Sequence, residues 1–217
     1  MNKPQLLKAL ESISSFVEVA NDTIKEDSSL SGISCSNMIV DRGDYQNIEI
    51  RKSYFENMSF DHCNFEKASF VDVIFQVCDL SNSMFKGAYF ERCQFIHCKG
   101  VGIDMSKTLL KHVGFEQSNL QYAYFEYAKL NDVEFNHVNL TEVSFSEVQF
   151  KNFTASKSKF INNNFFKTML DKIDFSDNDF INPIVSNNYI ELKGIILNSI
   201  QAVDLVSLFG IVIKDKE

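Results

Sequence analysis

Nearly every fifth residue in the central part of this chain is a large apolar side chain, and the register holds from Tyr45 to Ile190. Of the thirty positions in this series, seventeen are phenylalanine and six are leucine. Chance would place only about a fifth of the chain's phenylalanines in one such phase. A period of five fits neither the 3.6-residue repeat of an amphipathic helix nor the two-residue alternation of a strand. It predicts a chain that bends at regular intervals.

Units such as FEKAS, CDLSN, GAYFE and SNLQY resemble the pentapeptide-repeat proteins. In that family the centre of each unit and the residue two before it point inward, and four units form one square coil. The resemblance covers roughly residues 30 to 190 and implies an all-β fold, a right-handed quadrilateral β-helix of seven to eight coils. Residues 20 apart then stack, so one column of the core is expected to contain Phe55, Phe75, Phe95, Phe115 and Phe135.

Both ends of such a stack need a cap, because each coil covers only its neighbours. We expect an N-terminal cap helix and lead-in over residues 1–29, the solenoid over 30–192, and a C-terminal cap and dimerisation segment over 193–217. Apolar residues follow Pro4 at helical spacing in the first segment, namely Leu6, Leu10, Ile13, Val17 and Ala20. The last segment leaves the five-residue phase and is too apolar to stand alone in water.

The C-terminal stretch LNSIQAVDLVSLFGIVI resembles the end of the Qnr-type quinolone-resistance proteins, and GVGIDM (100–105) resembles one of their glycine-containing stretches. This resemblance implies a C-terminal helix that packs against its twofold mate, giving a homodimer through Ile200, Leu205, Leu208 and Phe209. It also implies binding to DNA gyrase or topoisomerase IV and relief of fluoroquinolone inhibition. The repeat here has no inserted loop, so the chain is more similar to the loop-free members. The alternative is a pentapeptide-repeat interaction scaffold with an unrelated protein partner.

The net charge of −8 argues against direct binding of nucleic acid and favours a basic partner. Assignment by residue number modulo 20 places five carboxylates, opposed only by Lys157, on the face of the Phe55 column: Glu56, Glu116, Glu134, Asp174 and Asp177. We name this the acidic face, and the preceding face, with five acidic and seven basic residues, the mixed-charge face. An acidic face on a rod of duplex-like width predicts a DNA mimic that a basic groove could bind. The alternative is that these carboxylates bind no partner and lie on this face only because an acidic protein must expose its carboxylates.

Tyr122, Tyr124 and Tyr127 are expected to face outward near one corner, either as interface aromatics or as spacers on a solvated surface. The four histidines all follow a centre by two residues, and we expect them to be exposed and to bind no metal. The cysteines lack metal-ligand spacing and are expected to be buried thiols. Gly100 replaces a centre, which predicts a hole or a local inward shift.

The sequence contains no P-loop, nucleophile elbow, dinucleotide fingerprint or HExxH motif, and a filled solenoid offers no substrate pocket. We therefore expect a binding protein, without enzyme activity and without a cofactor. Neither a signal peptide nor an apolar stretch long enough for a membrane span is present. These features predict a cytoplasmic protein with no membrane partner.

Overall fold

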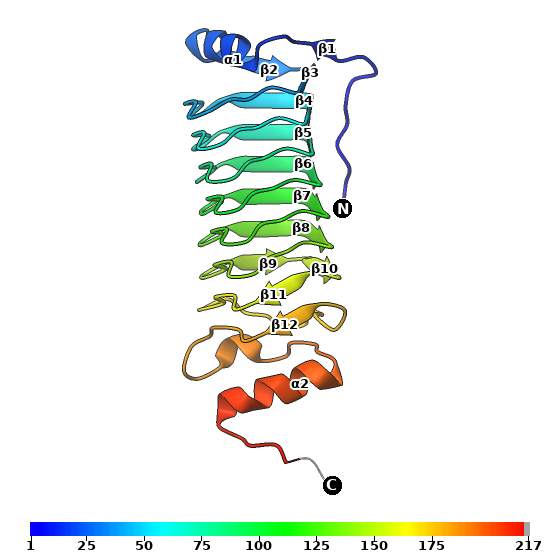
Figure 1. Ribbon diagram of the computed structural model, residues 1–217, viewed down its shortest axis with the longest axis vertical. Helices are drawn as coiled ribbons and strands as arrows, with labels where there is room; N and C mark the ends of the chain where they lie inside the picture. Colours follow the sequence, from blue (N-terminus) through cyan, green and yellow to red (C-terminus); the bar gives the residue numbers. More distant parts are fainter. Residues whose placement is uncertain (215–217) are drawn as a thin grey trace.

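The five-residue period builds short straight sides joined by tight corners. Residues with positive φ recur two places after the centres, as at Asn57, His62, Lys67 and Asp72, and turn the chain at each corner. Each lap lies on the one before it in parallel register with a 20-residue shift, so that Phe75 pairs with Phe95. The computed structural model describes residues 1–214 and is a parallel β-solenoid of about nine turns (Figure 1).

The stack begins earlier than the repeat count suggested, which explains why it exceeds the expected seven to eight coils. Strands β2 (Ser29–Ser31) and β3 (Ile33–Ser36) already pair with β4 (Glu49–Glu56). Each strand from β4 to β8 runs along the mixed-charge face, turns a corner and continues along the acidic face. The strands that follow are β5 (Ser69–Gln76), β6 (Tyr89–Ile96), β7 (Leu109–Glu116), β8 (Lys129–Asn136), β9 (Gln149–Lys151), β10 (Thr154–Ser156), β11 (Lys159–Ile161) and β12 (Asp179–Ile181).

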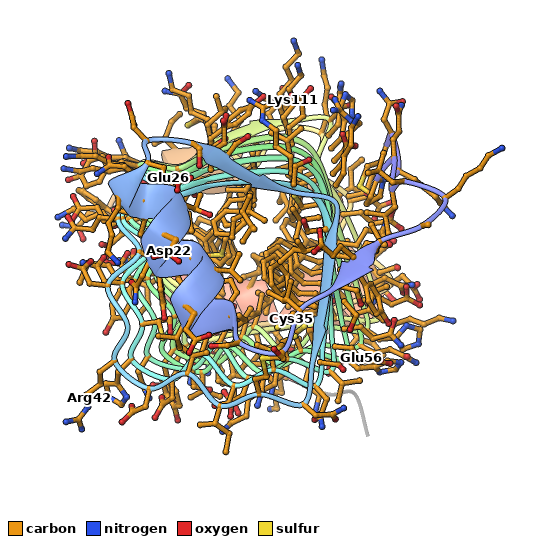
Figure 2. The ribbon with its side chains drawn as sticks, turned by 90° about the horizontal axis from the view of Figure 1, so that it is seen from above. Asp22, Glu26, Cys35, Arg42, Glu56 and Lys111 are labelled. Carbon is orange, nitrogen blue, oxygen red and sulfur yellow. The ribbon has the colours of Figure 1, made fainter. Side chains whose placement is uncertain are left out.

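The interior is filled by ring columns, as the sequence predicts. Ring centroids lie 4.9 Å apart between Phe75 and Phe95 and 4.7 Å apart between Phe95 and Phe115, both pairs stacked. All five members of the predicted column are buried. Viewed along its axis, the molecule has a square outline with its side chains packed inside and charged side chains radiating from every side (Figure 2).

Two departures from the repeat are repaired by neighbouring side chains. Ala155 stands at a centre, but Phe153, two residues earlier, supplies the missing ring and lies 5.6 Å from Phe135. At Gly100 an added Cβ would lie 2.9 Å from Cδ2 of Leu120, so leucine already occupies the space of the absent side chain. Of the two alternatives expected at Gly100, a hole is therefore excluded.

The N-terminal cap helix exists, but it begins at Phe16 and not after Pro4. Helix α1 (Phe16–Lys25) starts where the Ser15 hydroxyl accepts a hydrogen bond from the Glu18 N–H at 3.3 Å. Phe16 inserts its ring between Tyr45, Phe55 and Phe60 and closes the end of the core. Of the apolar residues expected on the helix, only Ala20 is fully buried: Leu6, Leu10 and Ile13 lie in an extended segment, and Val17 lies in α1 but is exposed.

At the other end, the five-residue phase stops before the predicted Ile190, which is exposed, while Leu192 is buried. The 3-10 helix η1 (Ile190–Leu192) breaks the coil, and α2 (Ser199–Val206) and the 3-10 helix η2 (Ser207–Phe209) follow. Gln201 fastens α2 to the last lap by donating to the carbonyl of Phe175 at 3.0 Å. Within residues 1–214, no helix has the length and apolar character needed to cross a bilayer.

Val77 occupies a corner with φ of 56°, a conformation that β-branched side chains disfavour. One lap earlier in the same corner column, the Asn57 amide donates to Asn37 at 2.7 Å. We expect Val77→Asn to raise the free energy of unfolding by about 1 kcal/mol, because asparagine tolerates left-handed backbone. Urea denaturation measures this change. The reverse substitution, Asn57→Val, should destabilise the protein by a similar amount. A loss of stability in Val77→Asn would show that the left-handed backbone at Val77 is not strained.

Candidate partner-binding surface

The acidic face presents its five carboxylates to solvent, as expected, but not in one continuous row. Glu116 and Glu134 lie on the adjacent strands β7 and β8, whereas Glu56 lies three laps earlier. Asp174 and Asp177 lie toward the C-terminal end, and all five are exposed. Hydrogen bonds from Ser176 hold the pKa of the Asp174 carboxyl below its usual value. The face therefore offers three separate negative sites at neutral pH.

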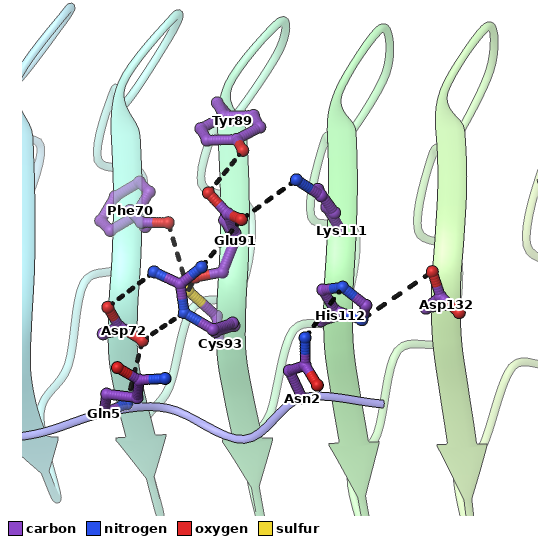
Figure 3. Close-up of polar contacts among 11 residues, drawn as sticks. Asn2, Gln5, Phe70, Asp72, Tyr89, Glu91, Cys93, Lys111, His112 and Asp132 are labelled. Carbon is purple, nitrogen blue, oxygen red and sulfur yellow. Dashed lines mark hydrogen bonds and ion pairs between the residues drawn. The ribbon is translucent and has the colours of Figure 1, made fainter.

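Between Glu56 and Glu116 an extended segment crosses the edge of this face, which the sequence did not predict. We name residues 1–12 the N-terminal strap; it includes strand β1 (Glu11–Ser12), which pairs with β3. The Gln5 N–H donates to Asp72 at 2.9 Å, and the Asn2 amide lies 3.4 Å from Nε2 of His112. Figure 3 shows the strap running past successive strands beside these two side chains.

A network of charged groups at the corner between the two faces holds the strap. Arg92 donates twice to the Asp72 carboxylate, at 2.7 Å from Nε and 2.8 Å from Nη2. Asp72 is only 3% exposed. Burial raises the pKa of this carboxyl, but the hydrogen bonds from Arg92 and the Gln5 N–H outweigh burial and leave the pKa below its ordinary value.

The mixed-charge face has most of its central cations engaged in ion pairs. Arg92 and Lys111 both contact Glu91, at 2.8 and 3.2 Å, and Tyr89 donates to the same carboxylate at 2.8 Å (Figure 3). Arg51 pairs with Glu49. Since these charges are balanced within the face, it offers a weaker net field than the acidic face does.

The three tyrosines all project into solvent, with exposed fractions of 46% for Tyr122, 48% for Tyr124 and 54% for Tyr127. Tyr124 lies on the side of the rod opposite the acidic face, and the other two lie at the corners of that side. We name this side the tyrosine face. By the same count it also carries five carboxylates against four lysines: Asp44, Glu66, Asp104, Glu126 and Glu147 against Lys67, Lys86, Lys107 and Lys167. The same modulo-20 count applied to every face could have found them.

The four residues expected to mediate dimerisation divide into two pairs. Leu205 is buried and Leu208 is half-buried against the chain's own last laps, so they serve the cap. Ile200 is 73% exposed and Phe209 is 52% exposed. These two share the C-terminal end with other exposed apolar side chains, among them Val203, Ile211, Val212 and Ile213.

The sulfur and imidazole groups are arranged as structural or surface groups. All five cysteines are buried and free, and burial raises the pKa of the Cys93 thiol to about 12. Asp41, Asp61 and His62 cluster at an exposed corner, but His62 pairs with Asp61 at 3.0 Å and Arg42 with Asp41 at 3.8 Å. These donors have partners within the chain, and we assign no metal to them.

Comparisons with known proteins agree with this architecture. The family model of the pentapeptide repeat region matches residues 68–145. A search among curated proteins found no match. A trypsin-treated QnrB1, described as a plasmid-mediated fluoroquinolone resistance protein, has 21% sequence identity and a TM-score of 0.48, covering 86% of this chain and 98% of its own.

Two further solved structures match this chain, and one of them has a different described role. HetL of Nostoc sp., described as involved in regulating heterocyst differentiation, has 15% identity, a TM-score of 0.32 and coverage of 79% and 90% of the two chains. Rfr23 of Cyanothece has 13% identity, a TM-score of 0.41 and coverage of 65% and 97%. At these values the solved structures do not select a function. Residues 68–145 thus match a pentapeptide repeat region, and the same coil continues on both sides of the matched part.

Proposed function

We propose that this protein binds DNA gyrase or topoisomerase IV and protects the enzyme from fluoroquinolones. The observation that carries the proposal is the acidic face, where five exposed carboxylates lie along one side of a rod whose interior is filled. A rigid surface of this sign complements the basic groove that a DNA-binding enzyme presents to the duplex. The sequence resemblance of the C-terminal stretch to Qnr-type proteins points to the same class of partner.

The shape of the protein supports a binding role over a catalytic one. The rings of successive laps stack at about van der Waals distance along the axis, so the interior has no room for a substrate. Recognition must therefore use the outer faces. A rod held by parallel pairing along its length also keeps the spacing of its surface charges fixed, as mimicry of a stiff duplex requires.

A supercoiling assay tests the proposal. Added to gyrase or topoisomerase IV with ciprofloxacin, the protein is expected to restore activity at concentrations below those at which it inhibits the enzyme. Glu116→Lys combined with Glu134→Lys should require at least 10-fold more protein, because two attractive contacts become repulsive. The matched control, Glu26→Lys with Glu142→Lys, changes the net charge equally away from the acidic face. Absence of rescue by the wild-type protein with both enzymes would remove the proposal.

The alternative is a scaffold for an unrelated protein partner, and the tyrosine face is the observation that favours it. Tyrosine is enriched at protein interfaces relative to the rest of a protein surface. A pull-down in which Tyr124→Ala and Tyr127→Ala abolish capture of a non-topoisomerase protein, while Glu116→Lys and Glu134→Lys do not, would support this alternative.

We also propose that the protein is a homodimer through its C-terminal end, where Ile181, Val203, Ile211 and Ile213 line a hollow together with the polar residues Asn182, Asp204 and Ser207. Ile200→Glu with Phe209→Glu is expected to convert the dimer into a monomer, because both side chains are exposed in the single chain. Sedimentation equilibrium measures the change. Ile39→Glu, at an exposed position near the other end, is the control, and a monomeric wild-type protein would refute the proposal.

A further inference from the structure

The N-terminal strap lies where a partner of the acidic face would have to bind. Its tip reaches β7, where Met1 and Lys3 line the same surface hollow as Glu116 and Glu134. These are the two carboxylates that lie on adjacent strands. A lysine of this chain therefore lines the same hollow that a basic partner of these two carboxylates would enter.

A glycine in the middle of β7 fits this seating of the strap. Gly114 has no positive φ that would require glycine, and a Cβ built on it would lie 3.0 Å from the terminal carbon of Met1. Other laps carry side chains at this place in the column, such as Tyr54, Ile74, Gln94 and Thr154. A glycine inside a strand often marks a close approach by another chain segment. Here the absent side chain leaves the space that Met1 fills.

The attachment of the strap is strong near the cap and weak at the tip. The Glu11 N–H donates to the carbonyl of Gly32, just before β3, at 2.8 Å, and the Ile13 N–H donates to the carbonyl of Ser34 in β3 at 3.1 Å. Farther along, the attachments are the Gln5 N–H to Asp72, the 3.4 Å contact of Asn2 with His112, and the packing of Met1. Met1 remains 46% exposed. The tip can therefore detach while β1 stays paired.

From this arrangement we infer that the strap is an internal cover of the acidic face. Its tip competes with an extended, lysine-bearing segment of a partner for the site formed by Glu116 and Glu134. Covalent attachment gives the strap a high effective concentration, so even weak contacts keep the site occupied until a stronger partner displaces them. That the competing partner is a topoisomerase rests on the proposed function. The position of the strap on the acidic face does not.

Gly114→Tyr opens the cover without changing any charge, because the ring takes the space of Met1 and the same column accepts Tyr54. Thr154→Tyr places the same ring in the same column beyond the strap and is the matched control. A nitroxide on Asn2→Cys reports the seating, and it labels one site since the five native cysteines are buried. We expect an immobilised spectrum in the otherwise wild-type chain and with Thr154→Tyr, and a mobile one with Gly114→Tyr.

Tetralysine is the probe for the uncovered site, followed by amide NMR shifts of Glu116 and Glu134. Its apparent affinity should rise at least 5-fold in Gly114→Tyr relative to both the wild-type protein and Thr154→Tyr. Addition of Glu116→Gln and Glu134→Gln should abolish the gain. A label that is already mobile in the wild-type background, or a tetralysine affinity that does not change when the strap is released, would overturn the inference.

The supercoiling assay separates this inference from the proposed function. If Gly114→Tyr binds tetralysine more tightly but neither it nor the wild-type protein rescues gyrase or topoisomerase IV, the cover stands and the topoisomerase proposal fails. If the wild-type protein rescues either enzyme but Gly114→Tyr leaves tetralysine binding unchanged, the topoisomerase proposal stands and the inference of a cover fails. If both are correct, Gly114→Tyr should protect at a lower protein concentration than the wild-type chain.

Discussion

Replacement of Phe115 by alanine is expected to lower the free energy of unfolding by about 3–5 kcal/mol. The Phe115 ring is 1% exposed and lies between those of Phe95 and Phe135, at centroid distances of 4.7 and 4.9 Å. Removal of the ring leaves a cavity that the parallel ladder on both sides prevents from collapsing. Chemical denaturation followed by circular dichroism measures the loss.

The control for this experiment is the same substitution at a phenylalanine outside the repeat phase. Phe166 is 40% exposed, and Phe166→Ala should change the free energy of unfolding by no more than about 1 kcal/mol. Similar losses in the free energy of unfolding for the two variants would mean that the ring column containing Phe115 does not stabilise the core.

Arg92→Met is expected to lower the free energy of unfolding by about 3 kcal/mol, because it leaves the buried Asp72 carboxylate without its cation. Arg92 is the charged partner of that carboxylate in the corner network, and the Gln5 N–H is a neutral one. Arg51→Met is the matched control. Its pair with Glu49 is solvent-exposed, so its loss should cost about 0–1 kcal/mol.

The pH dependence gives a second readout of the same pair. Since the pKa of Asp72 is lower in the folded protein than in the unfolded chain, its contribution is present above about pH 4. That contribution is lost as the pH falls through the folded-state value. We expect the stability of Arg92→Met to fall less steeply over this acid range than that of the wild-type protein. An unchanged slope would show that Asp72 titrates normally.

The columns of the core could be predicted because one inward position recurs at a fixed spacing, and every lap repeats the same local geometry. Prediction failed where a neighbouring side chain substitutes for the expected one. Phe153 replaces the ring missing at Ala155, and Leu120 fills the space at Gly100. Such repairs depend on contacts between laps, which a count of positions along the chain does not contain.

The assignment of the surface charges to faces was also available from the sequence, but the shape of the surface was not. Apolar residues have helical spacing over residues 4–20, yet the helix begins only at Phe16, because this ring closes the core and Ser15 caps the helix just before it. The N-terminal strap, which is outside the helix, instead contacts Asp72 and Gly114, and both lie far from it in sequence. The sequence likewise could not show whether Leu205 packs against its own chain or against a second copy, because an apolar side chain suits both.

The contacts of the strap also depend on the number of laps in the rod. Because Gln5 meets Asp72 and Asn2 meets His112 two laps farther on, the extended chain spans a fixed number of steps along the axis. Loss of a whole 20-residue lap between these positions would leave the ladder continuous and the core columns intact. The strap would then be too long, and its tip would no longer meet the strand it now touches. The length of the middle of the rod is thus tied to its first few residues, although the coils themselves would tolerate any whole number of laps.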